Sequence, residues 1–390
     1  MKHNKFLYLL CCVCLVWAFT VSADATIGVS AQAAVLLCAD NGEVIYAVNE
    51  HERLSMASTT KIMTSLLVLE EKTPFRQVSV TKQMVSVEGT SMGLLPGDTV
   101  SFDALVHGML LASGNDAANT AAIVVGGSAE NFASMMNRRA DEIGMDNTNF
   151  VTASGLDDEE HYSTAYDMAL LACEALENPE FRSICAKKTA TLCYGNPPYS
   201  RTLTNHNRLL WSYSHAIGVK TGFTKKSGRC LVSAAERDGI TLVAVTLNDR
   251  DDWNDHINML EYGFSQVKKS EVFPDLSSVK LPIVGGDVAG VAVESDKIPA
   301  IVSSFPVEYK VYLRQFEYAP INAGECVGYV EYVSDGKVCG YSCIVAAQDA
   351  NVKAITEVSE SKESTQDNQN FFKRAINRIK STLYGLFYGN

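Results

Sequence analysis

The chain has 390 residues, of which 47% are hydrophobic, and this is enough for two domains with real cores. Its net charge of -12 argues against a nucleic-acid partner, because such a partner requires basic patches on the protein. Three of the 11 cysteines lie in an apolar N-terminal segment, and the others are scattered. We therefore expect small core residues rather than a disulfide framework, with a bridge among Cys326, Cys339 and Cys343 left open.

Residues 1–23 are predicted to form a secretory signal peptide. Basic side chains at Lys2 and Lys5 precede an apolar run, Phe6–Phe19, that is too short to favour a membrane-spanning helix. Small residues ending at Ala23 match the positions that a signal peptidase reads. The alternative is a retained N-terminal anchor, and in both cases the chain that follows is expected to be exported.

The first half of the chain combines strand-like and helical patterns. Ala33–Cys38 and Glu43–Val48 are apolar, strand-like runs, and Asp40–Gly42 between them has the composition of a hairpin turn. A helix is expected after this hairpin, over the apolar run that begins at Ser58. Further helical patterns cover residues 104–111, 117–125, 128–143 (with Ser128 as a natural N-cap) and 164–177.

A second hairpin is predicted farther along the chain. Gly228–Ala235 and Ile240–Val245 have strand patterns on either side of a turn at Asp238-Gly239, and an amphipathic helix follows over Trp253–Phe264. Strands at both ends of a segment with helices between them indicate an antiparallel sheet covered by helices. We assign this α/β (α+β) catalytic domain to residues 24–268.

The pattern changes after about Lys269. Residues 279–347 are rich in strand patterns with regular turn signals, which predicts a small all-β C-terminal domain at residues 273–350. Residues 351–370 are polar and lack periodicity, so we interpret them as a linker. Residues 371–390 carry apolar side chains at helical spacing, with basic side chains between them. This pattern predicts an amphipathic helix that anchors the protein to a membrane surface, and the alternative is a helix that packs on its own protein.

The stretch Ser58-Thr59-Thr60-Lys61 contains a candidate nucleophile and a candidate base. Residues three positions apart share a face of a helix, so we expect the Ser58 hydroxyl and the Lys61 amine to lie side by side. A hydroxyl needs such a base to attack at neutral pH, and a lysine can be that base when burial or positive neighbours lower its pKa. Taken alone, this short pattern fits an ordinary solvated helix start equally well.

Two further motifs decide how this stretch is interpreted. Ser113-Gly114-Asn115 follows a predicted helix, and Lys220-Thr221-Gly222 precedes the second hairpin. Each of them alone is explained by a turn or by an exposed strand end. In the order Ser-x-x-Lys, Ser-x-Asn, Lys-Thr-Gly, the three motifs form the signature of penicillin-binding proteins and serine β-lactamases.

The chain resembles the low-molecular-mass penicillin-binding proteins of the D-alanyl-D-alanine carboxypeptidase type. Gly155-Leu156, His161–Ala169 and Thr204–Leu210 are further stretches typical of that family. The resemblance implies a β-lactamase/transpeptidase-like catalytic domain. It also implies a serine peptidase that removes the terminal D-alanine from peptidoglycan stem pentapeptides and is inhibited by β-lactam antibiotics. The expected location is the cell envelope, at the outer face of the cytoplasmic membrane.

The resemblance assigns catalytic roles to three residues. It implies Ser58 as the nucleophile that forms the acyl-enzyme, Lys61 as its general base and Ser113 as the proton relay to the leaving amine. The backbone N–H groups of Ser58 and Phe223 are expected to form the oxyanion hole. This chemistry requires no cofactor and no metal ion. The acidic run Asp157–His161 looks like a metal cluster, but consecutive side chains point apart, so we interpret it as a solvated loop.

The residues implied to bind the substrate are Asn115, Lys220, Thr221, Gly222, Phe223 and Arg250. Asn115 is expected to hydrogen-bond the peptide backbone, and Lys220 with Thr221 to hold the terminal carboxylate. A side chain at Gly222 would block a substrate that lies along the strand edge. Arg250 is a further candidate for the carboxylate, although its place in the family pattern is left open.

Two other functions are considered beside the carboxypeptidase. A serine β-lactamase shares the acylation apparatus but needs a base for deacylation, usually a Glu in a Glu-x-x-Leu-Asn segment. We consider Glu159 and Glu160 as candidates for this base, but their sequence context is different. A non-catalytic penicillin-binding sensor needs spanning helices and a cytoplasmic output, and the sequence offers no pattern for either.

Overall fold

Residues 27–354 are described by the structure, which is a computed structural model. The predicted signal peptide (1–23), the predicted C-terminal helix (371–390) and most of the predicted linker (351–370) lie outside the described residues. The described chain forms two compact units. The first comprises residues 27–273, 298–310 and 331–341, and the second comprises residues 274–297, 311–330 and 342–354.

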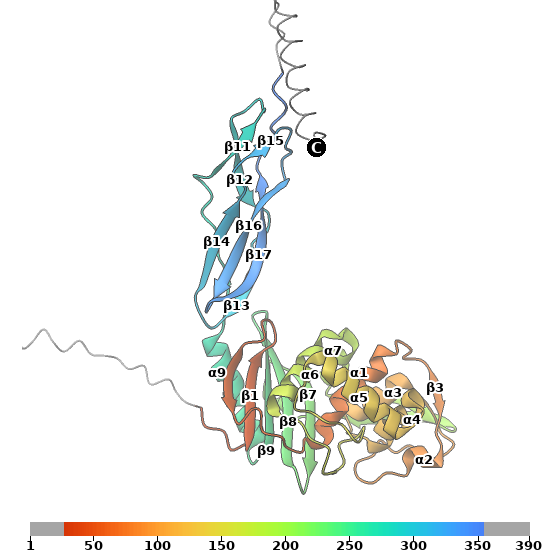
Figure 1. Cartoon of the computed structure of the whole chain (residues 1–390). Helices are drawn as coiled ribbons and strands as arrows, with labels where there is room; N and C mark the ends of the chain where they lie inside the picture. Colours follow the sequence, from red (N-terminus) through yellow and green to blue (C-terminus); the bar gives the residue numbers. More distant parts are fainter. Residues whose placement is uncertain (1–26, 355–390) are drawn as a thin grey trace, which may run out of the picture. The chain divides into compact units, whose positions relative to one another are not determined.

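A five-stranded antiparallel sheet forms the centre of the first unit, with the strand order β2-β1-β9-β8-β7 (Figure 1). Its strands are β1 (Ala33–Cys38), β2 (Val44–Val48), β7 (Ala216–Thr224), β8 (Gly228–Arg237) and β9 (Ile240–Asp249). Side chains alternate between the two faces of a strand. On β1 they enter two different cores, with Ala33, Val35 and Leu37 on one face and Ala34, Leu36 and Cys38 on the other. The sheet is therefore buried on both faces, in agreement with the predicted fold class.

Helices cover both faces of this sheet (Figure 1). Helix α9 (Asp252–Gln266) packs on one face through Met259 and Leu260, whereas α1 (Lys61–Glu70) and α6 (Ala165–Glu177) pack on the other. The other helices are the 3-10 helix η1 (Ala57–Thr60), α2 (Lys82–Val85), α3 (Phe102–Leu110), α4 (Asn115–Gly126), α5 (Ala129–Ile143), α7 (Pro179–Cys185) and α8 (Leu209–Ser212). Among residues 27–354, no helix has the length and apolar character needed to cross a membrane.

Side-chain caps set the ends of the predicted helices. The Ser128 Oγ accepts a hydrogen bond from the Asn131 N–H at 3.2 Å, which starts α5 and confirms the predicted cap. Thr164 caps α6 in the same way, with the Asp167 N–H at 3.0 Å. Helix α5 ends at Gly144, whose φ of 87° lies in the left-handed region that glycine tolerates. These local signals explain why the predicted and observed helices agree closely here.

Three two-stranded sheets complete the first unit. They are β3 (Gln77–Ser79) with β4 (Thr99–Ser101), β5 (Thr189–Gly195) with β6 (Pro198–Thr204), and β10 (Lys268–Glu271) with β13 (Ala300–Ser303). The strands over residues 189–204 are not predicted from the sequence. The hairpin nevertheless supports the site, because the buried Tyr194 hydroxyl donates to the Met92 carbonyl at 2.8 Å, in the loop packed beside α4.

The C-terminal region is rich in strands, as predicted. A six-stranded sheet has the order β14-β16-β17-β12-β11-β15. Its strands are β11 (Lys280–Val284), β12 (Gly290–Ser295), β14 (Val307–Leu313), β15 (Glu317–Tyr318), β16 (Cys326–Ser334) and β17 (Lys337–Ala346). In the second unit, a disulfide joins Cys326 to Cys343, which resolves the alternative left open among three cysteines. Cys38, Cys185 and Cys230 are buried as expected, whereas Cys193 is exposed and does not fit that expectation.

Candidate active site

The three sequence motifs come from separate parts of the first unit. Ser58 lies in η1, and Lys61 is the first residue of α1. Ser113 precedes the start of α4, and Asn115 is its first residue. Lys220 lies in β7, the strand at the edge of the central sheet. The contacts among these side chains decide what the arrangement can do.

Ser58 and Lys61 are in direct contact. The Ser58 Oγ lies 2.9 Å from the Lys61 Nζ. The turn that joins them is a 3-10 helix, in which side chains three positions apart eclipse each other. The predicted proximity is confirmed, and the local geometry is tighter than the regular helix start that the sequence analysis assumed.

Lys61 has three hydrogen-bond partners, and two of them can only accept. Its Nζ lies 2.7 Å from the Asn115 Oδ1 and 2.6 Å from the Ser154 carbonyl oxygen. A neutral amine has two N–H groups and one lone pair. If both N–H groups donate to these oxygens, the lone pair is left to face the third partner, the Ser58 hydroxyl. The geometry therefore suits a neutral Lys61 that accepts the proton of Ser58.

The surroundings of Lys61 favour this neutral form. Its side chain is fully buried in the first unit. Burial, and then the positive charge of Lys220, lower the pKa of Lys61 well below the usual range of a lysine, while Asp116 acts in the opposite direction. Burial also lowers the pKa of Lys220, to about 7. Lys220 thus helps Lys61 to lose its proton, whereas the lowered pKa of Lys220 comes from burial alone.

Ser113 is joined to the second lysine rather than to the first. Its Oγ accepts a hydrogen bond from the Lys220 Nζ at 3.1 Å, and that Nζ also donates to the Thr221 carbonyl at 2.8 Å. Ser113 has a φ of 57°, a left-handed conformation that costs a non-glycine residue roughly 1–2 kcal/mol. Such strain is often found at functional sites. The turn brings this hydroxyl to the buried ammonium of Lys220.

Asn115 is held at both ends of its amide. Its Oδ1 accepts from Lys61, and its Nδ2 donates to the Glu88 carbonyl at 2.7 Å, which fixes the orientation of the amide. In this structure Asn115 therefore orients Lys61. The contact with a substrate backbone that the sequence analysis assigned to Asn115 stays a prediction.

Asp116 fixes the loop that flanks α4. This buried carboxylate accepts from Ser91 Oγ at 2.7 Å and from the N–H groups of Met92, Gly93 and Leu94 at 2.9, 3.1 and 2.9 Å. These hydrogen bonds hold residues 91–94 against the start of α4. The negative charge that opposes deprotonation of Lys61 is thus a structural feature of this loop.

Strand β7 runs directly beside η1. A Cβ atom on Gly222 would lie 3.0 Å from the Met56 carbonyl oxygen and 3.0 Å from the Ser58 backbone nitrogen. Gly222 is therefore needed for close packing of β7 on the turn Ala57–Thr60, which contains Ser58 and is called the nucleophile turn below. This packing role is not predicted from the sequence. The same contact brings β7 up to the N–H of Ser58, one of the two predicted oxyanion-hole donors. Phe223, which supplies the other, is 66% exposed, so its side chain contributes little to the core.

Arg250 lies one residue beyond the end of β9. In the sheet, Asp249 pairs with Arg229 of β8, and Arg229 pairs with Phe223 of β7. Arg250 is therefore at the same end of the sheet as Phe223, two strands away from it. Its side chain is exposed, and its backbone N–H donates to the Ser30 Oγ at 3.3 Å.

Residues 18–251 match the family described as D-alanyl-D-alanine carboxypeptidase. The chain belongs to this family. It is 32% identical to the D-alanyl-D-alanine carboxypeptidase DacF of Bacillus subtilis, over 82% of this chain and 85% of that one. It is also 32% identical to DacC of Escherichia coli, over 86% of this chain and 87% of that one. The crystal structure of penicillin binding protein 5 from Haemophilus influenzae is 26% identical, with a TM-score of 0.64 over 83% of this chain and 98% of that chain.

Membership in the D-alanyl-D-alanine carboxypeptidase family confirms the fold class and the enzyme class predicted from the motifs. The chain is a serine-type peptidase of the penicillin-recognising superfamily, with a β-lactamase/transpeptidase-like fold. The predicted carboxypeptidase function in the cell wall is supported, and neither the β-lactamase nor the sensor is favoured. A cell-envelope location agrees with this family.

Several residues near the motifs were missed by sequence reasoning. The Ser154 carbonyl binds Lys61, and the neighbouring Gly155 packs so closely that a Cβ there would lie 1.8 Å from the Ala57 carbonyl oxygen. Gly155 was noted only as part of a family stretch, and a backbone carbonyl has no sequence signal. His161 was interpreted as part of a solvated loop. In the structure residues 157–160 are exposed, but His161 is buried and contacts Thr60, so that interpretation was wrong for the histidine.

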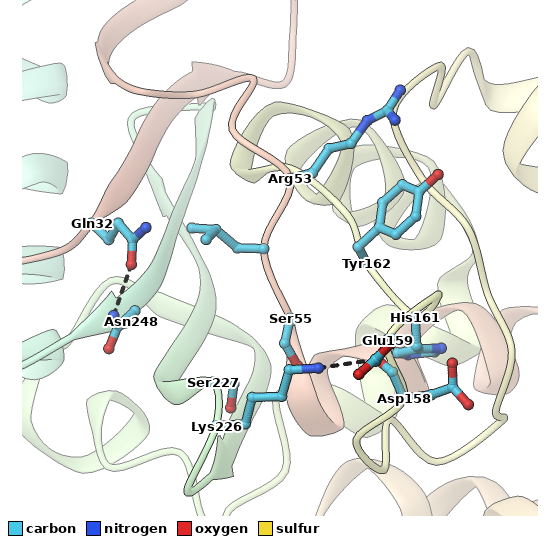
Figure 2. A pocket seen from close by; sticks show the side chains of 11 residues that line it. Gln32, Arg53, Ser55, Asp158, Glu159, His161, Tyr162, Lys226, Ser227 and Asn248 are labelled. Carbon is cyan, nitrogen blue, oxygen red and sulfur yellow. Dashed lines mark hydrogen bonds between the residues drawn. The ribbon is translucent and has the colours of Figure 1, made fainter.

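A hollow of about 400 Å³ is lined in part by Ser55, which stands two residues before η1 (Figure 2). Ser55, His161, Lys226 and Ser227 are among its lining residues. The Lys226 Nζ, between β7 and β8, donates to the carbonyl of Asp158, in the loop before α6, at 3.4 Å. Within residues 27–354, no cluster of three or more His, Cys, Asp or Glu side chains is arranged to hold a metal ion.

Proposed function

We propose that Ser58 attacks a peptidoglycan stem peptide ending in D-Ala-D-Ala, at the carbonyl carbon of the penultimate D-alanine. The Ser58 proton passes to the neutral amine of Lys61 while the bond between Oγ and the carbonyl carbon forms. A proton then returns through Ser113 to the departing amine, the C–N bond breaks, and D-alanine leaves. Water hydrolyses the ester and regenerates Ser58. β-Lactam antibiotics would acylate the same hydroxyl.

One observation carries this proposal: two of the three hydrogen-bond partners of Lys61 can only accept, and the third is the Ser58 hydroxyl. The side-chain Oδ1 of Asn115 and the backbone carbonyl oxygen of Ser154 accept both N–H groups of a neutral amine, so the lone pair is directed at Ser58. A solvated lysine at a helix start would have neither these two acceptors nor a pKa lowered by burial.

The other predicted residues are proposed to bind and orient the substrate. Lys220 and Thr221 would hold the terminal carboxylate, with Arg250 as a further cation at the same end of the sheet. The backbone N–H groups of Ser58 and Phe223 would bind the oxyanion. The close packing of Gly222 on the nucleophile turn supports this role, because it brings β7 to the Ser58 N–H.

The direct test uses the purified protein and a diacetylated tripeptide ending in D-Ala-D-Ala. We expect release of D-alanine and covalent labelling by penicillin, and both should disappear together in Ser58→Ala. Ser65→Ala is the matched control, because Ser65 is a buried serine of α1 that contacts the Met109 Sδ. Labelling without release of D-alanine would support the sensor, and rapid hydrolysis of penicillin would support the β-lactamase.

We further propose that residues 24–268 form the catalytic domain and residues 273–350 the β-rich domain, after export directed by residues 1–23. Residues 371–390 would anchor the enzyme to the outer face of the cytoplasmic membrane. The support is the spacing of apolar residues such as Ile376 and Leu383, with lysines and arginines between them.

Two variants test the anchor. Deletion of residues 371–390 should move the protein from the membrane fraction to the soluble fraction. The double substitution Ile376→Asp and Leu383→Asp keeps the length and the basic residues, and it should have the same effect because it interrupts the apolar face. If fractionation is unchanged in both variants, the segment does not anchor the protein.

A further inference from the structure

We propose that His161 is a positioning residue for the nucleophile, because it holds the Ala57 carbonyl through the hydroxyl of Thr60 and thereby fixes the turn that presents Ser58. Ala57 directly precedes Ser58, and Thr60 directly precedes Lys61. The inference depends on the proposed role of Ser58. It adds a residue that touches neither the substrate nor the two reacting side chains.

The hydrogen-bond partners of the Thr60 hydroxyl show which atom donates in each of its two contacts. The Thr60 Oγ1 lies 2.8 Å from the Ala57 carbonyl oxygen and 2.8 Å from the His161 Nε2. A carbonyl only accepts, so the single hydroxyl proton of Thr60 goes to Ala57. The Thr60 oxygen must then accept from His161, which requires a proton on Nε2.

The other ring nitrogen leads independently to the same tautomer. The His161 Nδ1 accepts from the Val151 N–H at 2.9 Å and from the Thr152 N–H at 3.3 Å. An atom that accepts two N–H groups carries no proton, so the neutral ring has its proton on Nε2. Both contacts therefore require the same neutral form of His161.

Burial favours this neutral form. His161 is 2% exposed, and its ring packs edge-on against Phe150 with the centroids 5.9 Å apart. Burial lowers the pKa of His161 to about 4, with Asp158 and Asp157 acting in the opposite direction and Lys61 in the same direction. A protonated Nδ1 would face the two backbone N–H groups that it now accepts, so the neutral ring persists at physiological pH.

The turn that His161 supports is strained and therefore needs support. Ala57 has a φ of 47°, and the left-handed conformation costs a residue with a side chain on the order of 1–3 kcal/mol. Its carbonyl also packs against Gly155, where no Cβ fits. If the carbonyl is released, the peptide that leads into Ser58 can rotate, and the Ser58 N–H and Oγ move with it. Figure 2 shows His161 and Ser55, which line the same hollow.

A matched pair of substitutions separates the two functions of the ring. In His161→Asn, the side-chain oxygen can replace Nδ1 and keep the loop in place, but the donor to Thr60 is lost. In His161→Gln, the amide nitrogen can reach the position of Nε2 and keep that donor. Thr60→Val removes the hydroxyl that contacts both His161 and the Ala57 carbonyl, whereas Thr60→Ser keeps it.

The measurements are the rate of covalent acylation by penicillin and the kcat and KM for the D-Ala-D-Ala peptide. We expect His161→Asn and Thr60→Val each to lower acylation and kcat by roughly 10- to 100-fold, since a displacement of about 1 Å has that effect, with little change in KM. His161→Gln and Thr60→Ser should stay close to wild type. The double variant His161→Asn/Thr60→Val should be no slower than the slower single variant, because both residues act through one connection.

The control variant is Asn149→Ala. It removes the hydrogen bond from the Asn149 Nδ2 to the Glu160 carbonyl, at 2.6 Å, and so loosens the loop beside His161 without touching Thr60. It should lower thermal stability and leave acylation nearly unchanged.

Three results would overturn the inference: equal acylation rates in His161→Asn and His161→Gln, effects of His161→Asn and Thr60→Val that multiply in the double variant, or an equal loss of acylation in Asn149→Ala. Wild-type protein that is not acylated, or Ser58→Ala that still is, refutes the proposed nucleophile instead.

Discussion

The Nζ of Lys61 lies 2.9 Å from the Oγ of Ser58, on a fully buried side chain whose remaining partners are two carbonyl oxygens. This contact supports the proposal that Lys61, rather than a histidine, is the base for Ser58. It also makes the protonation state of a lysine the central electrostatic variable of the site.

Lys61→Arg tests whether Lys61 acts as a base or only as a positive charge. Arginine is slightly larger than lysine and permanently charged, and it does not deprotonate in proteins, so it cannot accept the Ser58 proton. We expect acylation by penicillin to fall by about 10²- to 10⁴-fold, the usual contribution of a general base. Circular dichroism should show an unchanged fold. An arginine variant that acylates like wild type would mean that charge alone is needed.

The second prediction concerns the alkaline limb of the pH profile. Burial lowers the pKa of Lys220 to about 7, so Lys220 loses its charge in the free enzyme above that pH. If its charge binds the substrate carboxylate, kcat/KM should fall as pH rises through about 7, because kcat/KM reports the free enzyme. In kcat the limb should lie at higher pH, since the bound carboxylate favours the charged amine.

Lys220→Arg is the control for this profile. Arginine stays charged at all accessible pH values, so the alkaline limb of kcat/KM should move above pH 10 if the variant remains active, whatever its absolute rate. An alkaline limb that stays in place would assign that limb to another group.

Gly222→Ala tests the close packing of β7 on the nucleophile turn. The added Cβ would lie 3.0 Å from the Ser58 backbone nitrogen, so the strand or the turn must shift. We expect acylation to fall by roughly 10- to 100-fold and stability by about 1–3 kcal/mol. Gly28→Ala is the matched control, since no atom lies within 4 Å of its added Cβ. Similar kinetics in the two variants would contradict a positioning role for this contact.

The predictable parts of the site are those in which the interacting residues are only a few positions apart in the sequence. Ser58 and Lys61 are three residues apart at the start of a helix, so their contact follows from helical spacing. The hairpin of β1 and β2 follows from the turn residues Asp40–Gly42 in the same way. The contact between Ser113 and Lys220 was predictable only through the family resemblance, because 107 residues separate the two.

Other features left no signal in the side-chain pattern. Every residue has a carbonyl group, so the sequence did not indicate that those of Ser154 and Ala57 are the ones in use. Strand β7 contains two glycines and polar residues, which weakens its strand pattern, and its place at the sheet edge comes from pairing with β8. His161 follows four acidic residues and therefore looked solvated, although tertiary packing buries it.

Arg250→Ala tests the proposed carboxylate contact. A charge-assisted hydrogen bond contributes about 1.5–3 kcal/mol, so KM for the D-Ala-D-Ala peptide should rise by roughly 10- to 100-fold. Amidation of the terminal carboxylate should raise KM by a smaller factor in the variant than in wild type, because only Lys220 and Thr221 then lose their contact with the carboxylate. Arg138→Ala, at another exposed arginine, is the control and should change neither constant. An unchanged KM in Arg250→Ala would remove Arg250 from the site.

The last prediction concerns stability in acid and depends on His256. This residue of α9 is fully buried, with its Nδ1 2.6 Å from the Ser233 Oγ and its Nε2 2.9 Å from the Thr246 Oγ1. Burial lowers the pKa of His256 from 6.5 to about 3, with Asp255 acting in the opposite direction.

Below pH 6.5 the unfolded chain therefore binds a proton at this position that the native protein does not, so the free energy of unfolding decreases as pH falls toward 3. The contribution of one such group is about 1.4 kcal/mol per pH unit. His256→Gln cannot titrate, so the pH dependence of its unfolding free energy, measured by urea denaturation between pH 6 and pH 4, should be weaker than that of wild type by about this amount. A slope in His256→Gln equal to that of wild type would mean that His256 takes up its proton in the native protein.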